Sequence, residues 1–297
     1  MNRYKSIIVF LVLTPAELLS QVNGYIFDSV DKNPIPFVNI WVQDENSGTT
    51  SDKKGFYEFE NDLIGKNLVI SSIGYERKIV TIDTNYLEIY LSPVTYSIPE
   101  INIQPKKNLE IRIGKYRKTQ VNKYTSPMGP QIFARYFEFK EEYSLTPFIS
   151  SIKLESFSKT EAIFNLRLLS VDSSGFPGND ILAENHLIKV REGRRSNQIK
   201  NLAYKHLVFP EEGMFVAVEF LIIKENEFKY KSKNTETGEI SEGITYMPFL
   251  GVIKTDSEKE GWVYRWGKWY KDLGKSTEEM GDDNVGHFLA VEITLTN

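Results

Sequence analysis

The feature that most constrains the fold is a two-residue period in the apolar positions. Residues 38–42 (VNIWV) and 289–295 (LAVEITL) are an early and a late example, and similar runs recur between them. Successive side chains of a strand point to opposite faces, so this period is typical of β-strands rather than helices. Clusters of Gly, Pro and Asp, such as residues 172–180 (DSSGFPGND), separate the runs. The pattern predicts an all-β fold built from many short strands.

Composition restricts the class of protein further. The 297 residues are 41% hydrophobic and 26% charged, which is typical of a soluble globular protein with one large domain or two ordinary ones. A net charge of -4 gives no reason to expect nucleic acid as a partner. The chain has no cysteine, which excludes disulfides, thiolate nucleophiles and Cys-ligated metals.

The first 20 residues have the layout of a signal peptide. Arg3 and Lys5 form a small positive region, residues 7–13 (IIVFLVL) form a short apolar region, and a polar stretch ends at Ser20. The apolar run is too short to span a bilayer, and no later segment approaches that length. We therefore predict an exported protein that is not an integral membrane protein, in the periplasm, associated with the outer membrane, or at the cell surface. A buried N-terminal strand or helix is the alternative.

Residues 21–92 are punctuated as a small sandwich. Asp52 and Gly55 take the first and fourth positions of a predicted type I turn, and Pro34 and Pro36 belong at a strand entrance or edge. The segment resembles the carboxypeptidase-regulatory-like domain, a transthyretin-like β-sandwich. The resemblance lies in Gly24, Asp28, Pro34, Pro36, Val38, Asn39, Ile40, Thr50, Asp52, Gly55, Tyr57, Phe59, Gly74 and Tyr75. It implies an accessory domain without catalytic residues, of a kind common in the envelope of Gram-negative bacteria.

The rest of the chain divides into two segments. Residues 93–130 contain several prolines and many Lys and Arg residues, so we predict a basic connector with one strand at 101–103. In residues 131–297 the alternation returns, which predicts a larger sandwich. This half is similar to jelly-roll-like domains that follow a carboxypeptidase-regulatory-like module in exported bacterial proteins, a family that implies no established activity.

Catalytic motifs are missing from the sequence. There is no G-x-S-x-G, no H-E-x-x-H and no phosphate-binding glycine loop, and His186, His206 and His287 are far apart. Glu219 and Glu292 occupy the polar faces of two strands and are a candidate carboxylate pair for a glycan-active enzyme, although alternation predicts that both face water. We therefore predict a protein that is not an enzyme and has no cofactor.

The loop at residues 172–180 is a candidate metal site. It offers oxygen ligands, but the spacing and the terminal Glu of an EF-hand are missing. Its residues are also those of ordinary turns, so we predict a turn without metal.

The most suggestive stretch is residues 261–270 (GWVYRWGKWY), which holds three of the four tryptophans. Exposed aromatic rings are platforms for sugar faces and for protein hot spots. We predict that Tyr264, Trp266 and Trp269 face a ligand; the alternative is that the aromatic face is core. The predicted function is a non-enzymatic binding or assembly protein of the bacterial envelope, whose second sandwich contacts an envelope protein or a glycan. A carbohydrate-binding protein and a glycan-active enzyme are the alternatives.

Overall fold

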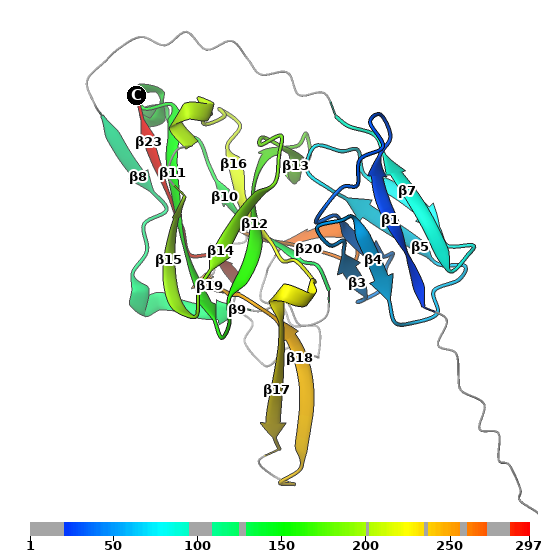
Figure 1. The fold of residues 1–297 in the computed structure, drawn as a ribbon. Helices are drawn as coiled ribbons and strands as arrows, with labels where there is room; N and C mark the ends of the chain where they lie inside the picture. The colour runs from blue at the N-terminus through cyan, green and yellow to red at the C-terminus, as the bar shows by residue number, and fades with distance from the viewer. Residues whose placement is uncertain are drawn as a thin grey trace, which may run out of the picture.

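The structure, a computed structural model, describes residues 21–94, 109–124, 129–199, 202–234, 237–255, 260–271 and 286–297. Within these ranges the regular structure is strands and short 3₁₀ turns, which confirms the all-β expectation (Figure 1). The 3₁₀ turns are η1 (Lys118–Gln120), η2 (Glu141–Leu145), η3 (Leu202–Lys205) and η4 (Lys224–Asn226). The predicted signal peptide and the strand expected at 101–103 lie outside the described residues.

The N-terminal part is a sandwich of two small sheets. One sheet has the order β4 (Phe56–Phe59), β1 (Val22–Asp28) and β7 (Tyr86–Leu91). The other has the order β3 (Gly48–Thr50), β2 (Asn39–Val42), β5 (Asn67–Ser71) and β6 (Lys78–Thr81). Apolar side chains from both sheets, including Ile26 and Ile89 from one and Ile40 and Ile70 from the other, form its core.

Local sequence explains two features of this sandwich. Gly24 lies where β1 runs parallel to β7, and a Cβ at this position would come within 1.8 Å of the Leu87 carbonyl oxygen. Only glycine allows so close an approach. The Asp52 carbonyl accepts from the Gly55 amide at 3.0 Å, and Gly55 has a φ of 75°, so the predicted reversal before β4 is a hydrogen-bonded turn.

The larger sandwich consists of two antiparallel sheets, which we call the inner and the outer sheet. The inner sheet, which faces the N-terminal sandwich, has the order β13 (Pro177–Asp180), β12 (Ala162–Val171), β16 (Met214–Glu219), β10 (Ile132–Phe137), β20 (Gly261–Arg265) and β21 (Lys268–Lys271), with β14 (His186–Val190) also paired to β12. The outer sheet has the order β22 (Gly286–Leu289), β19 (Phe249–Thr255), β11 (Phe148–Ser158), β23 (Val291–Thr296) and β8 (Glu110–Ile113), with β15 (Gly193–Ile199) on β11 and β9 (Val121–Tyr124) on β19.

The core of the larger sandwich lies between these sheets. Phe133, Leu166 and Val218 of the inner sheet pack with Leu154 and Ile293 of the outer sheet, and all five are almost fully buried. Two further strands of the outer sheet lie within residues 93–130, the predicted connector. Residues 110–113 and 121–124 are strands of the outer sheet, which basic side chains on their exposed positions concealed in the sequence.

A two-stranded ribbon, β17 (Glu227–Lys233) and β18 (Ile240–Tyr246), projects away from both sandwiches (Figure 1). Among the described residues, no helix has the length and apolar character needed to cross a membrane.

Candidate functional site: the cleft between the sandwiches

The two sandwiches pack together through strands whose two faces are both buried. In β2, Ile40 points into the N-terminal core, while Trp41 points out of it and is fully buried against the inner sheet. In β16, Val218 points into the core of the larger sandwich, whereas Phe215 points to the opposite face and belongs to the same apolar cluster as Trp41. The junction is therefore a third apolar core, shared between two domains that each have their own.

Further contacts extend this junction. Phe37, which precedes β2, packs with Leu221 and Ile223, which follow β16. A Cβ on Gly129 would lie 2.8 Å from the Trp41 ring, so the chain before β10 passes directly over that ring. Both contacts bury large apolar side chains, which is the main source of stability in such an interface.

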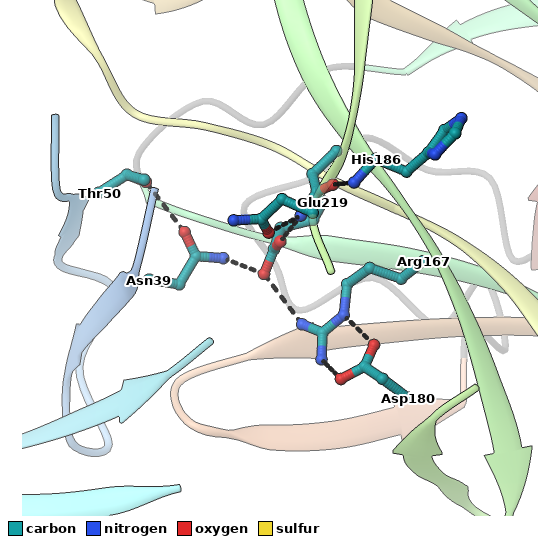
Figure 2. Close-up of polar contacts among 8 residues, drawn as sticks. Asn39, Thr50, Arg167, Asp180, His186 and Glu219 are labelled. Atoms are coloured by element: carbon teal, nitrogen blue, oxygen red, sulfur yellow. Dashed lines mark hydrogen bonds and ion pairs between the residues drawn. The ribbon is translucent and has the colours of Figure 1, made fainter. Parts of the chain in front are cut away.

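A buried polar network crosses the same junction, with Glu219 at its centre (Figure 2). Glu219 Oε1 accepts a hydrogen bond from Asn39 Nδ2 of the N-terminal sandwich at 2.7 Å, and from Arg167 Nη1 at 2.9 Å. Its other oxygen accepts from Asn165 Nδ2 at 2.9 Å. Arg167 also donates two bonds to Asp180, at 2.9 and 2.7 Å. The Glu219 carboxylate thus accepts hydrogen bonds from both domains.

The N-terminal side of this network is itself fixed. Thr50 Oγ1 donates to Asn39 Oδ1 at 2.9 Å, and the same hydroxyl accepts from the Ile222 amide of the larger sandwich at 2.9 Å. Asn39 is therefore oriented with its amide nitrogen toward Glu219 (Figure 2).

Burial and charge act in opposite directions on these ionisable groups. Burial raises the pKa of Glu219 above its ordinary value, and the neighbouring Arg167 partly opposes that rise. For Arg167, burial lowers the pKa, but Asp180 and Glu219 together raise it above its ordinary value. Arg167 therefore stays charged and holds both carboxylates, which is the arrangement that a buried ion needs.

Beside the network, the junction opens into a cleft of about 700 Å³. Its volume lies within the range of small-molecule sites. The N-terminal wall is formed by Ser71, Ser72, Tyr75, Glu76, Arg77 and Val94, and the opposite wall by Ile132, Arg167, Leu169, Ser170, Val171, Asp172, Pro177, Gly178, Asn179, Asp180, Tyr264 and Trp269. The lining is mixed, with aromatic rings, hydroxyls and charged groups together.

Two buried hydroxyls in the cleft have no partner among the described residues. They belong to Ser72 and Tyr264, each of which is 6% exposed. A buried polar group without a hydrogen bond costs about 1–3 kcal/mol. Such groups are rare in native proteins, and both belong to side chains that line the cleft.

The structure distributes the aromatic side chains of residues 261–270 between three environments. Tyr264 is buried and Trp269 half-buried; they are a cross-strand pair with ring centres 5.2 Å apart, and both line the cleft. Trp266 instead occupies the turn between β20 and β21, with a φ of 54°; the Arg265 guanidinium lies over its ring, and Tyr270 contacts it edge-on. Trp262 is buried in the junction. The aromatic face is therefore core at Trp262 and cleft wall at Tyr264 and Trp269.

The first domain fixes this turn in place. Arg77 Nη2 donates to the Gly267 carbonyl at 2.7 Å, and Lys268 bonds Asp44 at 2.7 Å. A non-glycine residue with positive φ is strained and persists where its surroundings over-determine it. The strained residue is Trp266, and the contacts that hold it are those of the neighbouring Gly267 and Lys268 with the first domain.

The carboxylate pair considered from the sequence does not form. Glu219 lies in the inner sheet and Glu292 in the outer sheet, with the apolar core between them. The expectation that alternation places both in water is wrong for Glu219, because the N-terminal sandwich covers its face.

In the 172–180 loop, Asp172 Oδ1 accepts the amides of Ser174 and Phe176, each at 2.8 Å. This is the hydrogen bonding of a turn. Within the described ranges, no three His, Asp or Glu residues are grouped as a metal site.

Sequence reasoning missed Ser72, Arg77 and Arg167 as cleft residues. The sequence did carry a signal that both faces of two strands are covered. Residues 37–42 (FVNIWV) and 214–223 (MFVAVEFLII) are almost continuously apolar, and strands buried on both faces lose their alternation. Glu219 lies inside the second of these runs, and a charged side chain in a buried strand needs a buried partner.

Comparison with known proteins identifies the first domain. Residues 22–103 match the family model of the CarboxypepD_reg-like domain, which confirms the resemblance. No curated protein matches the chain.

Three solved structures show similarity at low identity. Two are of Cwp84, a surface layer associated protein of Clostridium difficile. For its cysteine protease and lectin-like domains, the identity is 9% and the TM-score 0.37, covering 62% of this chain and 37% of that chain. For a variant of the Cwp84 cysteine protease after propeptide cleavage, the identity is 10% and the TM-score 0.39, and the match covers 88% of this chain and 65% of that chain.

The third is a putative membrane-associated protein of unknown function from Bacteroides fragilis NCTC 9343, with 9% identity and a TM-score of 0.20, covering 93% of this chain and 97% of that chain. The present chain spans less than two thirds of either Cwp84 chain. Residues 22–103 thus correspond to a CarboxypepD_reg-like domain, and further β-sandwich structure follows it.

Proposed function

We propose that the protein is an exported, non-enzymatic binding protein of the Gram-negative bacterial envelope, and that its contact site is the cleft between the sandwiches. The observation that carries this proposal is the cleft wall, where Trp269 lies beside the buried, unpartnered hydroxyl of Tyr264. The proposal moves the contact from the second sandwich alone to the boundary of both, because Ser72 and Arg77 of the first domain line the same cleft.

The chemistry of the wall suits recognition. Aromatic rings supply large contact area at little cost in entropy, and a few placed polar groups supply orientation. The cleft combines Trp269 and Tyr75 with the hydroxyls of Ser72 and Tyr264. These groups lie on strands or next to them, so the site is preformed rather than built on a long loop.

The state of the carboxylates supports a non-enzymatic function. Asp180 and Glu219 both bond Arg167, so each is held as an ion-pair partner. General acid or base catalysis requires a carboxyl group free to exchange its proton with a substrate. Export is supported by the signal-like pattern of residues 1–20.

A photo-crosslinking experiment tests the proposal. The chain from Gln21 onward, carrying benzoylphenylalanine at Trp269, is irradiated with native envelope extract and with an immobilised envelope glycan fraction. Leu145, which is 66% exposed, carries the same photo-reactive group as the control position. A saturable adduct formed at position 269 and not at position 145 is the expected result. Equal labelling at both positions, or none, contradicts the proposal.

A second variant ties the adduct to the cleft. Tyr264→Phe removes only the unpartnered hydroxyl, so we expect a protein at least as stable as the wild type that forms less of the adduct at position 269. Tyr57→Phe is the matched control, because Tyr57 Oη bonds the Leu87 carbonyl at 3.4 Å inside the first sandwich. That variant is expected to leave the adduct unchanged.

A further inference from the structure

We propose that the ligand is a neutral oligosaccharide that extends from the cleft, past Val171, into a second aromatic pocket on the larger sandwich. This inference rests on the proposed function, because the cleft is its first subsite.

The second pocket has a volume of about 280 Å³ and is lined largely by aromatic rings. The ring centres of Phe176 and Trp262 are 4.9 Å apart, and those of Tyr136 and Phe215 are 5.1 Å apart. Phe176 is 40% exposed although it is a large apolar side chain. It projects from the turn between β12 and β13, where a polar residue is the ordinary choice.

The pocket and the cleft are neighbours. Val171, which is half-buried, lines both of them. On β20, Trp262 lines the pocket and Tyr264 lines the cleft, and the two side chains share one face of the strand. Two residues along a strand correspond to about 7 Å. An occupant of both sites is therefore an extended chain rather than a single ring.

The charges of the lining predict a neutral occupant. The acidic side chains are Glu76, Asp172 and Asp180, and the basic side chains are Arg77, Arg167 and Lys271, which makes three of each sign. Of the basic groups, Arg167 is fully engaged by two carboxylates. No excess of either sign remains to select a charged ligand.

The remaining chemistry matches a sugar chain. Aromatic rings pack against the apolar faces of sugar rings, and each site provides one that is not fully buried: Phe176, which is 40% exposed, in the pocket and Trp269, which is half-buried, in the cleft. Sugar hydroxyls both donate and accept, which suits a wall that carries polar side chains such as Glu76, Arg77 and Asn179.

Isothermal titration calorimetry tests the inference. The chain from Gln21 onward is titrated with cello-, xylo-, malto-, manno- and N-acetylated chito-oligosaccharides of one to six units. For at least one series we expect the affinity to rise at least tenfold from one unit to the length that fills both sites. Phe176→Ala is expected to remove this gain while leaving single-unit binding, and Trp269→Ala, in the cleft, to weaken every length.

The control variant is Tyr204→Ala, which truncates an aromatic side chain that is 66% exposed and lies outside both sites. It is expected to bind as the wild type does. An affinity independent of length, or unchanged by Phe176→Ala, overturns the second subsite. The absence of binding in all five series overturns the ligand class. The proposed function then stands if crosslinking at position 269 still captures another ligand, and fails with the inference if it does not.

Discussion

Glu219 shows how one residue joins the two domains. It lies at the end of a strand and is 2% exposed, yet it accepts hydrogen bonds from Asn39 of one sandwich and from Arg167 of the other. Removing one partner of a buried ion pair leaves the other charge uncompensated, which is more costly than the pair itself is stabilising.

Glu219→Ala is therefore expected to lower the free energy of unfolding by about 3–5 kcal/mol. Urea denaturation monitored by circular dichroism measures this change. Glu292→Ala is the control, because Glu292 is half-buried on the far face of the larger sandwich, and we expect a change within about 0.5 kcal/mol. Equal effects of the two substitutions would contradict the network as described.

Tyr75, on the cleft wall, has a pKa that the fold displaces. Burial, and then the hydrogen bond that its hydroxyl donates to Asp28 at 3.0 Å, raise the pKa of Tyr75 to about 12. The folded protein binds this proton more tightly than the unfolded chain does. The corresponding stability is present below pH 10, and is lost as the pH rises through about 12.

Asp28→Asn is expected to bring the pKa of Tyr75 down toward 10.0, because it removes the negative charge and the charged acceptor while burial remains. The ¹³Cζ chemical shift of Tyr75, followed by NMR against pH, measures the titration. A midpoint unchanged by the substitution would mean that Asp28 has no part in the shift.

At the scale of elements, the strands with two buried faces determine the architecture. Alternation in residues 37–42 correctly assigned Ile40 to one face and Trp41 to the other. It did not show that the Trp41 face is covered, because the covering residues, such as Phe215 and Trp262, are more than 170 positions away in the chain. A local pattern defines which side chains share a face, whereas burial of that face depends on a distant partner.

The same limit explains the candidate site. Tyr264 and Trp269 were predictable, since aromatic clustering is visible in the sequence, and both do line the cleft. Ser72 and Arg77 were not predictable, because a single serine or arginine beside a strand end has no distinctive pattern. Strands β8 and β9 were missed for another reason: their exposed basic residues resemble those of a solvated connector.

Trp41→Ala tests whether β2 connects the sandwiches. Trp41 is fully buried in the junction, so its truncation is expected to cost about 3–5 kcal/mol of unfolding free energy. Ile79→Ala on the edge strand β6, where the side chain is 54% exposed, is the matched control and is expected to change little. Chemical denaturation of both variants supplies the measurement, and a small loss for Trp41→Ala would argue against a shared core.

For the whole molecule, the junction and the cleft are two parts of one surface. The four tryptophans of the chain all belong to its apolar cluster: Trp41 from the first sandwich, and Trp262, Trp266 and Trp269 from the second. Trp41 and Trp262 lie inside the junction, whereas Trp269 reaches the cleft. Any signal from tryptophan therefore reports on the region where the domains meet.

The most direct test of a ligand site at this boundary is ¹⁹F NMR of the protein labelled with 5-fluorotryptophan, titrated with the oligosaccharide that binds best in calorimetry. Single Trp→Phe variants assign the four resonances. We expect the Trp269 resonance to shift saturably, with the same midpoint as the heat of binding, while that of Trp41 stays in place. Saturable binding that leaves the Trp269 resonance unmoved would place the ligand elsewhere and contradict the account.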